Sequence, residues 1–206
     1  MSGMELDDLT ADALREFGNI GAGHAATALS VLLQGRVMMS VTDARLCPFR
    51  DIVDVVGGPE RLVAAVFIRI SGEISGNMFV LFSLASVDRL LDRLIEPIDS
   101  REDYSDLDLS AVAEVGNILT GAYVTAISDL CNIQLNQSVP SVAVDMAAAI
   151  LDIGLMMTGY DENEAILIST SLAHGQHSID GHFFMLPDVD GTRTLLRVLR
   201  RAPDHG

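Results

Sequence analysis

The chain has 206 residues, of which 49% are hydrophobic, enough for one large domain or two small intertwined halves around a sizeable core. Its formal net charge of −16 argues against nucleic acid and anionic lipid as partners, because both carry phosphates that an acidic surface repels. No apolar run is long enough to span a bilayer, and Cys47 and Cys131 belong to no CxxC pair. We therefore expect a cytoplasmic protein without membrane insertion, whose cysteines are core thiols and not nucleophiles.

The first half of the chain is predicted to begin with a long helix over residues 8–34. Apolar residues recur there at helical spacing, at Leu6, Leu9, Leu14 and Phe17. A strand, a hairpin of two strands and a short helix are expected after it, over residues 37–46, 62–71, 77–83 and 85–95. Gly72 and Gly76 bound the turn of this hairpin.

The second half is predicted to repeat this order after a polar linker from Asp99 to Asp108. A long helix is expected over residues 107–132. A strand, a hairpin and a short helix follow, over residues 135–144, 164–172, 181–186 and 190–201. Gly175 and Gly181 are expected to bound the second hairpin turn.

The two halves also match residue by residue. Residues 16–30 read EFGNIGAGHAATALS, and residues 114–128 read EVGNILTGAYVTAIS at a constant offset of 98. A second block, around the hairpins and final helices, matches at an offset of 105. We predict an α+β fold in which two helix–strand–strand–strand halves, about 8–98 and 107–201, share one sheet in a single pseudo-twofold domain over 1–206.

A polar stripe recurs on the two long helices. Asp12, Glu16 and Asn19 are spaced i, i+4, i+7, which places them within about 60° of one another on a helix. The second helix repeats the stripe with Ser110, Glu114 and Asn117. A single stripe would be an ordinary solvated face, but Asn is a poor residue for a helix interior and occurs here twice at the same phase. The stripes lack a histidine base, a nucleophile beside a base and a metal-ligand cluster, although an amide and a carboxylate can orient a water molecule and hold a cation.

The repeated motif [D/S]-x-x-x-E-x-x-N resembles that of the CheC/CheX/FliY phosphatases. The neighbouring segments NIGAGHAATALS, NILTGAYVTAISDL and PSVAVDMAAAIL look specifically like CheC, and the resemblance runs from about residue 8 to residue 200. It implies a hydrolase for the aspartyl phosphate of phospho-CheY in chemotaxis. The chain would need no cofactor of its own, because the active site of the response regulator supplies Mg²⁺.

The resemblance also implies roles for the stripe residues. Asn19 or Asn117 would enter the regulator's active site and orient a water for in-line attack on phosphorus, while Glu16 or Glu114 would pair with a lysine of the regulator. Asp12 and Ser110 would be accessory. This division suits phosphoryl transfer, which depends chiefly on positioning and charge neutralisation.

The apolar segment from Val142 to Leu155 is interpreted as a helix that carries two acids, Asp145 and Asp152. Ordinary core packing is one reading of it. In CheC proteins this region is associated with binding the receptor deamidase CheD, which makes Asp145 a candidate contact. A non-catalytic adaptor that binds phospho-CheY or sequesters CheD therefore remains the alternative to an enzyme.

Two further groups of residues suggest sites at first sight. Gly18, Gly21 and Gly23 could suggest a dinucleotide loop, but they lie within a predicted helix that no strand precedes, so close helix packing is favoured. Three histidines lie near the second hairpin, and we interpret them as part of a polar loop and not as metal ligands; they are His174, His177 and His182. His24 has Ala122 at its repeat position and is considered incidental.

Overall fold

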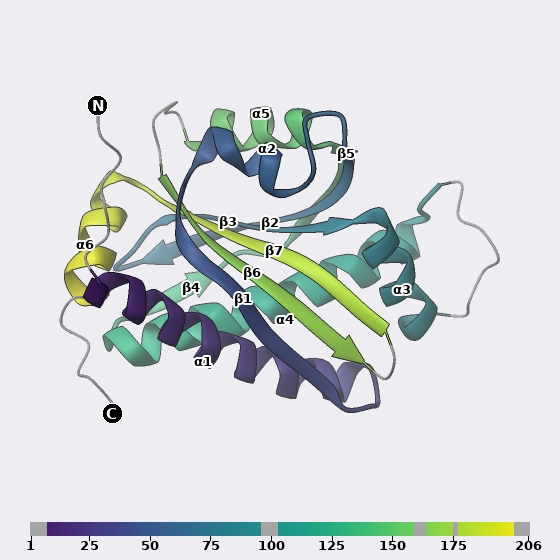
Figure 1. Cartoon of the computed structure of the whole chain (residues 1–206), viewed down its shortest axis with the longest axis horizontal. Helices are drawn as coiled ribbons and strands as arrows, with labels where there is room; N and C mark the ends of the chain where they lie inside the picture. Colours follow the sequence, from purple (N-terminus) through teal and green to yellow (C-terminus); the bar gives the residue numbers. More distant parts are fainter. Residues whose placement is uncertain (1–7, 96–102, 159–163, 175–176, 200–206) are drawn as a thin grey trace.

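The strands predicted from the sequence form one antiparallel sheet in the computed structural model, which describes residues 8–95, 103–158, 164–174 and 177–199. The sheet has seven strands in the order β1-β6-β7-β3-β2-β4, with β5 also paired to β2. The strands are β1 (Val37–Pro48), β2 (Leu62–Gly72), β3 (Gly76–Ser83), β4 (Leu135–Gln137), β5 (Ser141–Met146), β6 (Glu164–His174) and β7 (His177–Pro187). Helices cover both faces of this sheet (Figure 1).

The two long helices lie together on one face of the sheet, and the short helices α2 (Ile52–Val55) and α5 (Ala147–Thr158) lie on the other (Figure 1). The long pair is α1 (Asp8–Leu32) and α4 (Asp106–Cys131), which run side by side in opposite directions. The shorter helices are α2 (Ile52–Val55), which follows a 3-10 turn at Phe49–Asp51, α3 (Leu84–Leu94), α5 (Ala147–Thr158) and α6 (Val189–Leu199). Asp8 and Asp106, which begin α1 and α4, are 98 positions apart, as the sequence repeat requires.

The two halves exchange strands in forming the sheet. β1 of the first half pairs with β6 of the second, and β4 and β5 of the second half pair with β2 of the first. The hairpin β2–β3 meets the hairpin β6–β7 through the central pair β3–β7. The predicted α+β fold, with two similar halves sharing one sheet and two similar long helices, is therefore confirmed.

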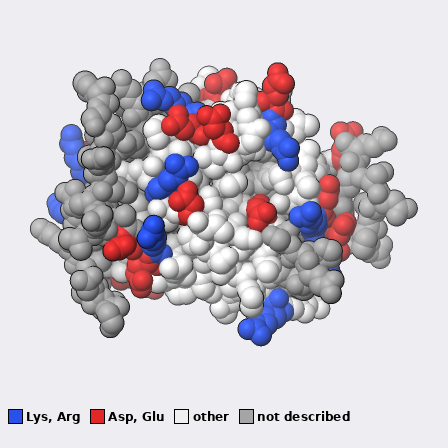
Figure 2. Space-filling view, viewed as in Figure 1, with Lys and Arg blue, Asp and Glu red and all other residues white. Residues whose placement is uncertain are grey.

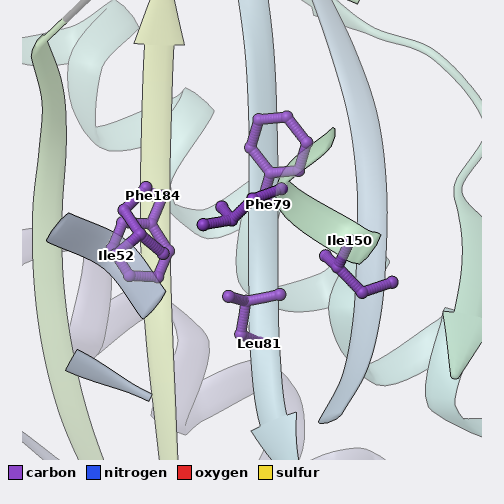
Figure 3. A pocket seen from close by; sticks show the side chains of 6 residues that line it. Ile52, Phe79, Leu81, Ile150 and Phe184 are labelled. Atoms are coloured by element: carbon purple, nitrogen blue, oxygen red, sulfur yellow. The ribbon is translucent and has the colours of Figure 1, made fainter. Parts of the chain in front are cut away.

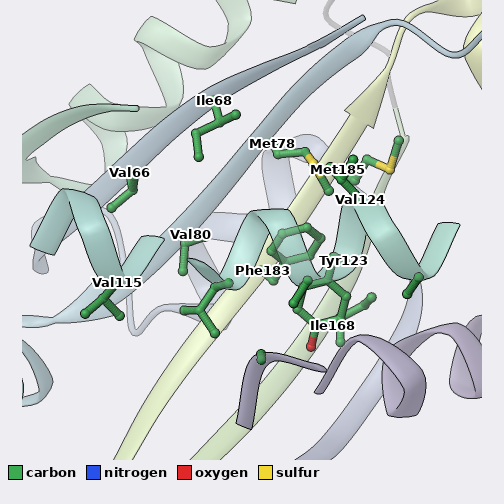
Figure 4. Packing of buried hydrophobic residues seen from close by; sticks show 14 of the residues in the cluster. Val66, Ile68, Met78, Val80, Val115, Tyr123, Val124, Ile168, Phe183 and Met185 are labelled. Atoms are coloured by element: carbon green, nitrogen blue, oxygen red, sulfur yellow. The ribbon is translucent and has the colours of Figure 1, made fainter. Parts of the chain in front are cut away.

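Alternate residues of the central strands fill two separate cores. The larger core lies between the sheet and the pair α1 and α4, where Tyr123 stacks on Phe183 with ring centroids 4.3 Å apart (Figure 4). On the other face, residues of α2 and α5 pack onto β3 and β7 (Figure 3). The cavity between Ile52, Phe79 and Ile150 is only about 10 Å³ and cannot hold a ligand.

The expected strand over 135–144 is interrupted. It is divided into β4 and β5 by Ser138–Pro140, where Pro140 has no N–H to donate and the Ser138 side chain accepts from the Arg69 N–H instead. The expected helix from Val142 to Leu155 is wrong in its first part, because residues up to Met146 belong to β5. Asp145 therefore lies in a strand that pairs with Val63 of β2, and the helix α5 starts only at Ala147.

The second hairpin also differs from the prediction. The two strands extend to His174 and His177, so Gly181 lies inside β7 opposite Phe82 and does not bound a turn. A Cβ on Gly181 would lie 2.9 Å from the Phe82 ring, so the glycine makes room for an aromatic side chain. Gly175 lies outside the described residues, whereas Gly72 and Gly76 bound the first turn as expected.

Candidate functional site

The first polar stripe is exposed along α1. Asp12, Glu16 and Asn19 all face solvent, while Leu14 and Phe17 on the opposite side of the helix are buried in the larger core. Phe17 also packs edge-on against Tyr123 of α4, with ring centroids 5.5 Å apart. The stripe is therefore carried by a helix that is anchored from behind.

The second stripe occupies the same phase on α4. Ser110 and Glu114 are exposed and Asn117 is half-buried, whereas Val112 and Val115 point into the core. The Ser110 hydroxyl donates to the backbone carbonyl of Asp106 at 2.7 Å and so turns back onto its own helix. The structure thus places all six predicted stripe residues on two matching helix faces.

The start of α4 is fixed by side chains just before the stripe. Ser105 caps the helix, and Asp108 completes a capping box by accepting from the Ser105 N–H at 2.9 Å. The neighbouring Tyr104 hydroxyl donates to Asp88 of α3 at 3.0 Å. These contacts hold the first turn of α4 and so limit the movement of Ser110 and Glu114.

Glycines bring the stripe helices close to their neighbours. A Cβ on Gly116, directly before Asn117, would lie 2.6 Å from the Val66 side chain, and a Cβ on Gly21 would overlap the Tyr123 ring. Gly18 is also close, with Val41 at 3.3 Å from its Cβ position. Close packing is thus confirmed for Gly18 and Gly21, but it is wrong for Gly23, which has nothing within 4 Å of its Cβ position.

A small open cavity adjoins Asn19. It has a volume of about 140 Å³ and is lined by Asn19, Arg15 and the β1 segment Val41–Ala44. The register of β1 against β6 shifts between Val41 and Asp43, so this segment bulges beside the stripe. Asp43 forms an ion pair with Arg45 at 2.8 Å, and the Asn19 amide therefore lies among polar groups that a partner could reach.

The surroundings of Asn117 are different. Its Oδ1 accepts a hydrogen bond from Gln137 Nε2 at 2.8 Å, and Gln137 is the last residue of β4. The two stripes lie in the N-terminal halves of α1 and α4, and these helices run in opposite directions (Figure 1). The two sites therefore lie toward opposite ends of one helical layer.

The other candidate residues do not join either stripe. Cys47 is buried and Cys131 half-buried, and both are free thiols. Burial raises the pKa of Cys131 to about 11 and also raises that of Cys47, so both remain protonated near neutrality, as expected for core thiols.

His182 does not lie in a polar loop, because β7 extends further than predicted. Its Nδ1 is 3.0 Å from Ser169 Oγ, and burial lowers its pKa although the charge of Asp180 opposes this shift. The side chains of His174 and His177 lie outside the described residues, and His24 is exposed on α1. Within the described ranges, no group of three His, Cys, Asp or Glu residues could hold a metal ion.

Asp145 and several large apolar side chains are exposed on β5 and α5. Asp145 lies near the end of β5, and its Oδ1 accepts from the Met146 N–H at 2.7 Å. Met146 of β5 and Ile153 and Met156 of α5 are also exposed, with 85% of Met156 accessible. Asp145 and these three apolar side chains are named here the α5 patch, and they lie on elements other than the two stripe helices.

Charge on the visible face of the molecule is dispersed. Figure 2 shows acidic and basic side chains in small mixed groups over a largely uncharged surface. No helix in the described part of the chain combines the length and the apolar character that crossing a membrane requires.

Three residues near the stripes were missed by the sequence reasoning. Arg15 and Gln137 adjoin the two asparagines, and Leu107 is 64% exposed at the phase of the second stripe, seven residues before Glu114. The repeat carries a signal for Gln137. The residue 98 positions earlier is the apolar Met39, so the polar side chain is present in only one of the two halves. Leu107 repeats Leu9, whose side chain lies outside the described residues.

Comparison with known proteins gives a consistent set of similarities. The model of the CheC-like family matches residues 9–41 and 107–144, which contain both stripes. The CheY-P phosphatase CheC of Bacillus subtilis is 39% identical over 91% of this chain and 92% of its own. The flagellar motor switch phosphatase FliY of the same organism is 31% identical over 67% of this chain, which covers 37% of FliY. Among solved structures, FliY of Thermotoga maritima superposes with a TM-score of 0.79 at 20% identity, covering 97% of this chain and all of that one.

Proposed function

Because the chain belongs to the CheC-like family and is an enzyme of the phospho-response-regulator phosphatase class, we propose that it hydrolyses the aspartyl phosphate of phospho-CheY at two sites, one on α1 and one on α4. The observation that carries this proposal is the repeated, exposed Glu–Asn stripe on two helices anchored from behind. Both stripes have the same spacing on their helices, and both lie in the segments that match the CheC-like family.

The asparagines would act on the attacking water. When α1 or α4 docks against the regulator, the carboxamide oxygen of Asn19 or Asn117 accepts a hydrogen bond from a water and directs its lone pair at phosphorus. Such positioning of a reactant can contribute several kcal/mol, roughly half of the 7–11 available from ideal orientation. No strong base is required, because an acyl phosphate has a good leaving group.

The glutamates would hold the regulator in register. Glu16 and Glu114 are exposed one turn before the asparagines, so each can pair with a lysine that borders the phosphorylation site. The Mg²⁺ that neutralises the phosphoryl oxygens belongs to the regulator and arrives with the substrate. Asp12 and Ser110 lie one turn further toward the helix start, where they would border the contact.

The proposal is tested by the decay of radiolabelled phospho-CheY with wild-type protein and with the double variant Asn19→Ala, Asn117→Ala. We expect the wild-type protein to accelerate decay and the double variant to lose that acceleration while melting cooperatively. A double variant that acts at the wild-type rate would contradict the assigned mechanism. A wild-type protein that binds phospho-CheY without accelerating decay would support the adaptor alternative.

We also propose that the α5 patch binds CheD. Exposed methionine and isoleucine side chains on the same two elements as an exposed acid suit protein binding, since the apolar groups provide buried area and the acid provides selectivity. The patch lies on β5 and α5 and not on α1, so bound CheD would leave the stripe on α1 open to the regulator.

The charge reversal Asp145→Lys tests this contact. We expect about tenfold weaker capture of CheD and a melting temperature within a few degrees of wild type, because Asp145 is exposed and its one side-chain bond is local. Asp129→Lys, an exposed acid near the end of α4, is the matched control for the change in charge. An Asp145 variant that melts normally and captures CheD fully would remove Asp145 from the interface.

A further inference from the structure

Gln137 separates the two otherwise similar sites. We propose that Gln137 is a positioning residue for Asn117, holding its carboxamide for catalysis in the second site, and that the first site has no such support. This inference rests on the proposed role of Asn117 in orienting the attacking water. It concerns how the second site works and does not assign a new reaction.

The strand β4 places Gln137 against the second stripe. Its backbone pairs with Ile70 of β2, and its side chain extends to α4, where Nε2 lies 2.8 Å from Asn117 Oδ1. The carboxamide of Gln137 also lies 3.6 Å from the Cβ position of Gly121, one turn after Asn117. The side chain therefore lies along the stripe and restricts the rotation of the Asn117 amide.

The direction of this hydrogen bond suits the proposed chemistry. An amide oxygen has two acceptor lone pairs, so Asn117 Oδ1 can accept from Gln137 and still accept from a water. Because Gln137 Nε2 donates to Asn117 Oδ1, the oxygen of the Asn117 amide, and not its NH₂ group, is held in one place. A fixed acceptor costs less ordering when the attacking water is aligned in the docked complex, because the rotamer of Asn117 is already selected.

Gln137 is not explained by stability alone. Its Oε1 is buried and has no hydrogen-bond partner among the residues that the structure describes. An orphaned buried acceptor is destabilising, so an apolar residue of similar size would suit this position better if only packing mattered. A functional contact with Asn117 accounts for the amide.

The first site lacks this arrangement. The residue 98 positions before Gln137 is Met39, which has no N–H donor in its side chain and packs against the larger core. Asn19 instead adjoins the open cavity of about 140 Å³ bordered by Val41–Ala44. Its side chain forms no hydrogen bond within the part of the chain that the structure describes. The same motif thus has a supporting side chain in the second site and, among the described residues, none in the first.

The test isolates the second site in an Asn19→Ala parent. Gln137→Met removes the donor with little change in volume and introduces the residue type of the first half. Gln134→Met, the same change at an exposed position three residues earlier, is the matched control. We expect Gln137→Met to lower kcat toward phospho-CheY about tenfold with KM within about twofold, and Gln134→Met to match the parent.

Two further measurements separate positioning from structural damage. Gln137→Glu keeps the size but offers an acceptor in place of the donor, so it should lower kcat at least as much as Gln137→Met. In ¹⁵N spectra the side-chain amide signals of Asn117 should shift in both Gln137 variants and stay in place in Gln134→Met. Thermal melting shows whether each variant is folded. If Gln137→Met does not fold, Gln137→Glu takes its place in the kinetic comparison.

The outcomes that overturn the inference are distinct from failure of the proposed function. Gln137 variants with the kcat of the parent would show that Asn117 needs no support. A raised KM with unchanged kcat would mean that Gln137 binds the regulator instead of positioning Asn117. If the wild-type protein itself failed to accelerate phosphate loss, the proposed function would fall, and the inference with it.

Discussion

Glu16 and Glu114 are equivalent in the repeat, in exposure and in their spacing from an asparagine. Each is a flexible carboxylate on a helix surface and is free to meet a cation on a partner. Such a residue contributes to partner selection more than to the stability of its own fold.

Reversing both charges should therefore weaken regulator binding. We expect Glu16→Lys with Glu114→Lys to raise the Kd for a regulator carrying a phosphate mimic by about tenfold or more, since a lysine would then face a lysine. Titration calorimetry measures this change. Glu60→Lys with Asp129→Lys, two exposed charge reversals before β2 and near the end of α4, controls for the altered net charge. Equal affinities in all three proteins would exclude the ion pair.

At the scale of elements, the crossing of α1 and α4 depends on Gly21. The Tyr123 ring fills the space that a side chain at residue 21 would occupy, and the same ring stacks on Phe183 of β7 (Figure 4). The glycine thus allows the helix pair and the sheet to share one buried aromatic side chain. Burial raises the pKa of Tyr123 well above its usual value, so the ring stays neutral.

Adding one methyl group at this crossing should be costly. We expect Gly21→Ala to lower the free energy of unfolding by about 1–3 kcal/mol, because overpacking outweighs the better helix propensity of alanine. Gly23→Ala is the matched control, since its Cβ position is open and alanine should stabilise the helix by about 1 kcal/mol. Chemical denaturation of both variants gives the two free energies of unfolding. Equal changes in the two variants would mean that α1 and α4 can move apart at this crossing without a loss of stability.

The α5 patch also depends on the arrangement of elements. Asp145 belongs to the edge strand β5, and the helix that carries Ile153 and Met156 begins only at Ala147. A continuous helix, as the sequence suggested, would have placed Asp145 within a turn of α5. The strand instead leaves it at the rim of the sheet.

At the scale of the whole molecule, strand exchange makes each half depend on the other. Without the second half, β1 would lose its partner β6, and β2 would lose β4 and β5. The exposed sheet edges and the uncovered larger core would then face water.

We accordingly expect residues 1–100 and 101–206 to fail to fold as separate monomers but to associate when co-expressed. Near-ultraviolet circular dichroism and thermal melting of each fragment and of the complex measure this. A monomeric fragment with a cooperative melting transition would show that one half is an independent domain.

The sequence by itself determined the elements that local physics and repetition specify. Helical periodicity located α1 and α4 to within about two residues, and the repeated spacing of Glu and Asn was sufficient to locate both stripes. Amphipathic spacing is a local property, so it survives folding wherever a helix packs one face on a sheet. Duplication then distinguished a functional stripe from an ordinary solvated face.

Only the tertiary structure decided the features that depend on contacts distant in sequence. The division of the expected strand at Pro140, the place of Asp145 in β5 and the inward position of Gly181 follow from pairing with β2 and packing against Phe82. The hydrogen bond from Gln137 to Asn117 joins residues 20 positions apart and needs β4 to lie beside α4. Spacing alone cannot specify such contacts, because register and close packing are set by the partner strand or helix as much as by the segment itself.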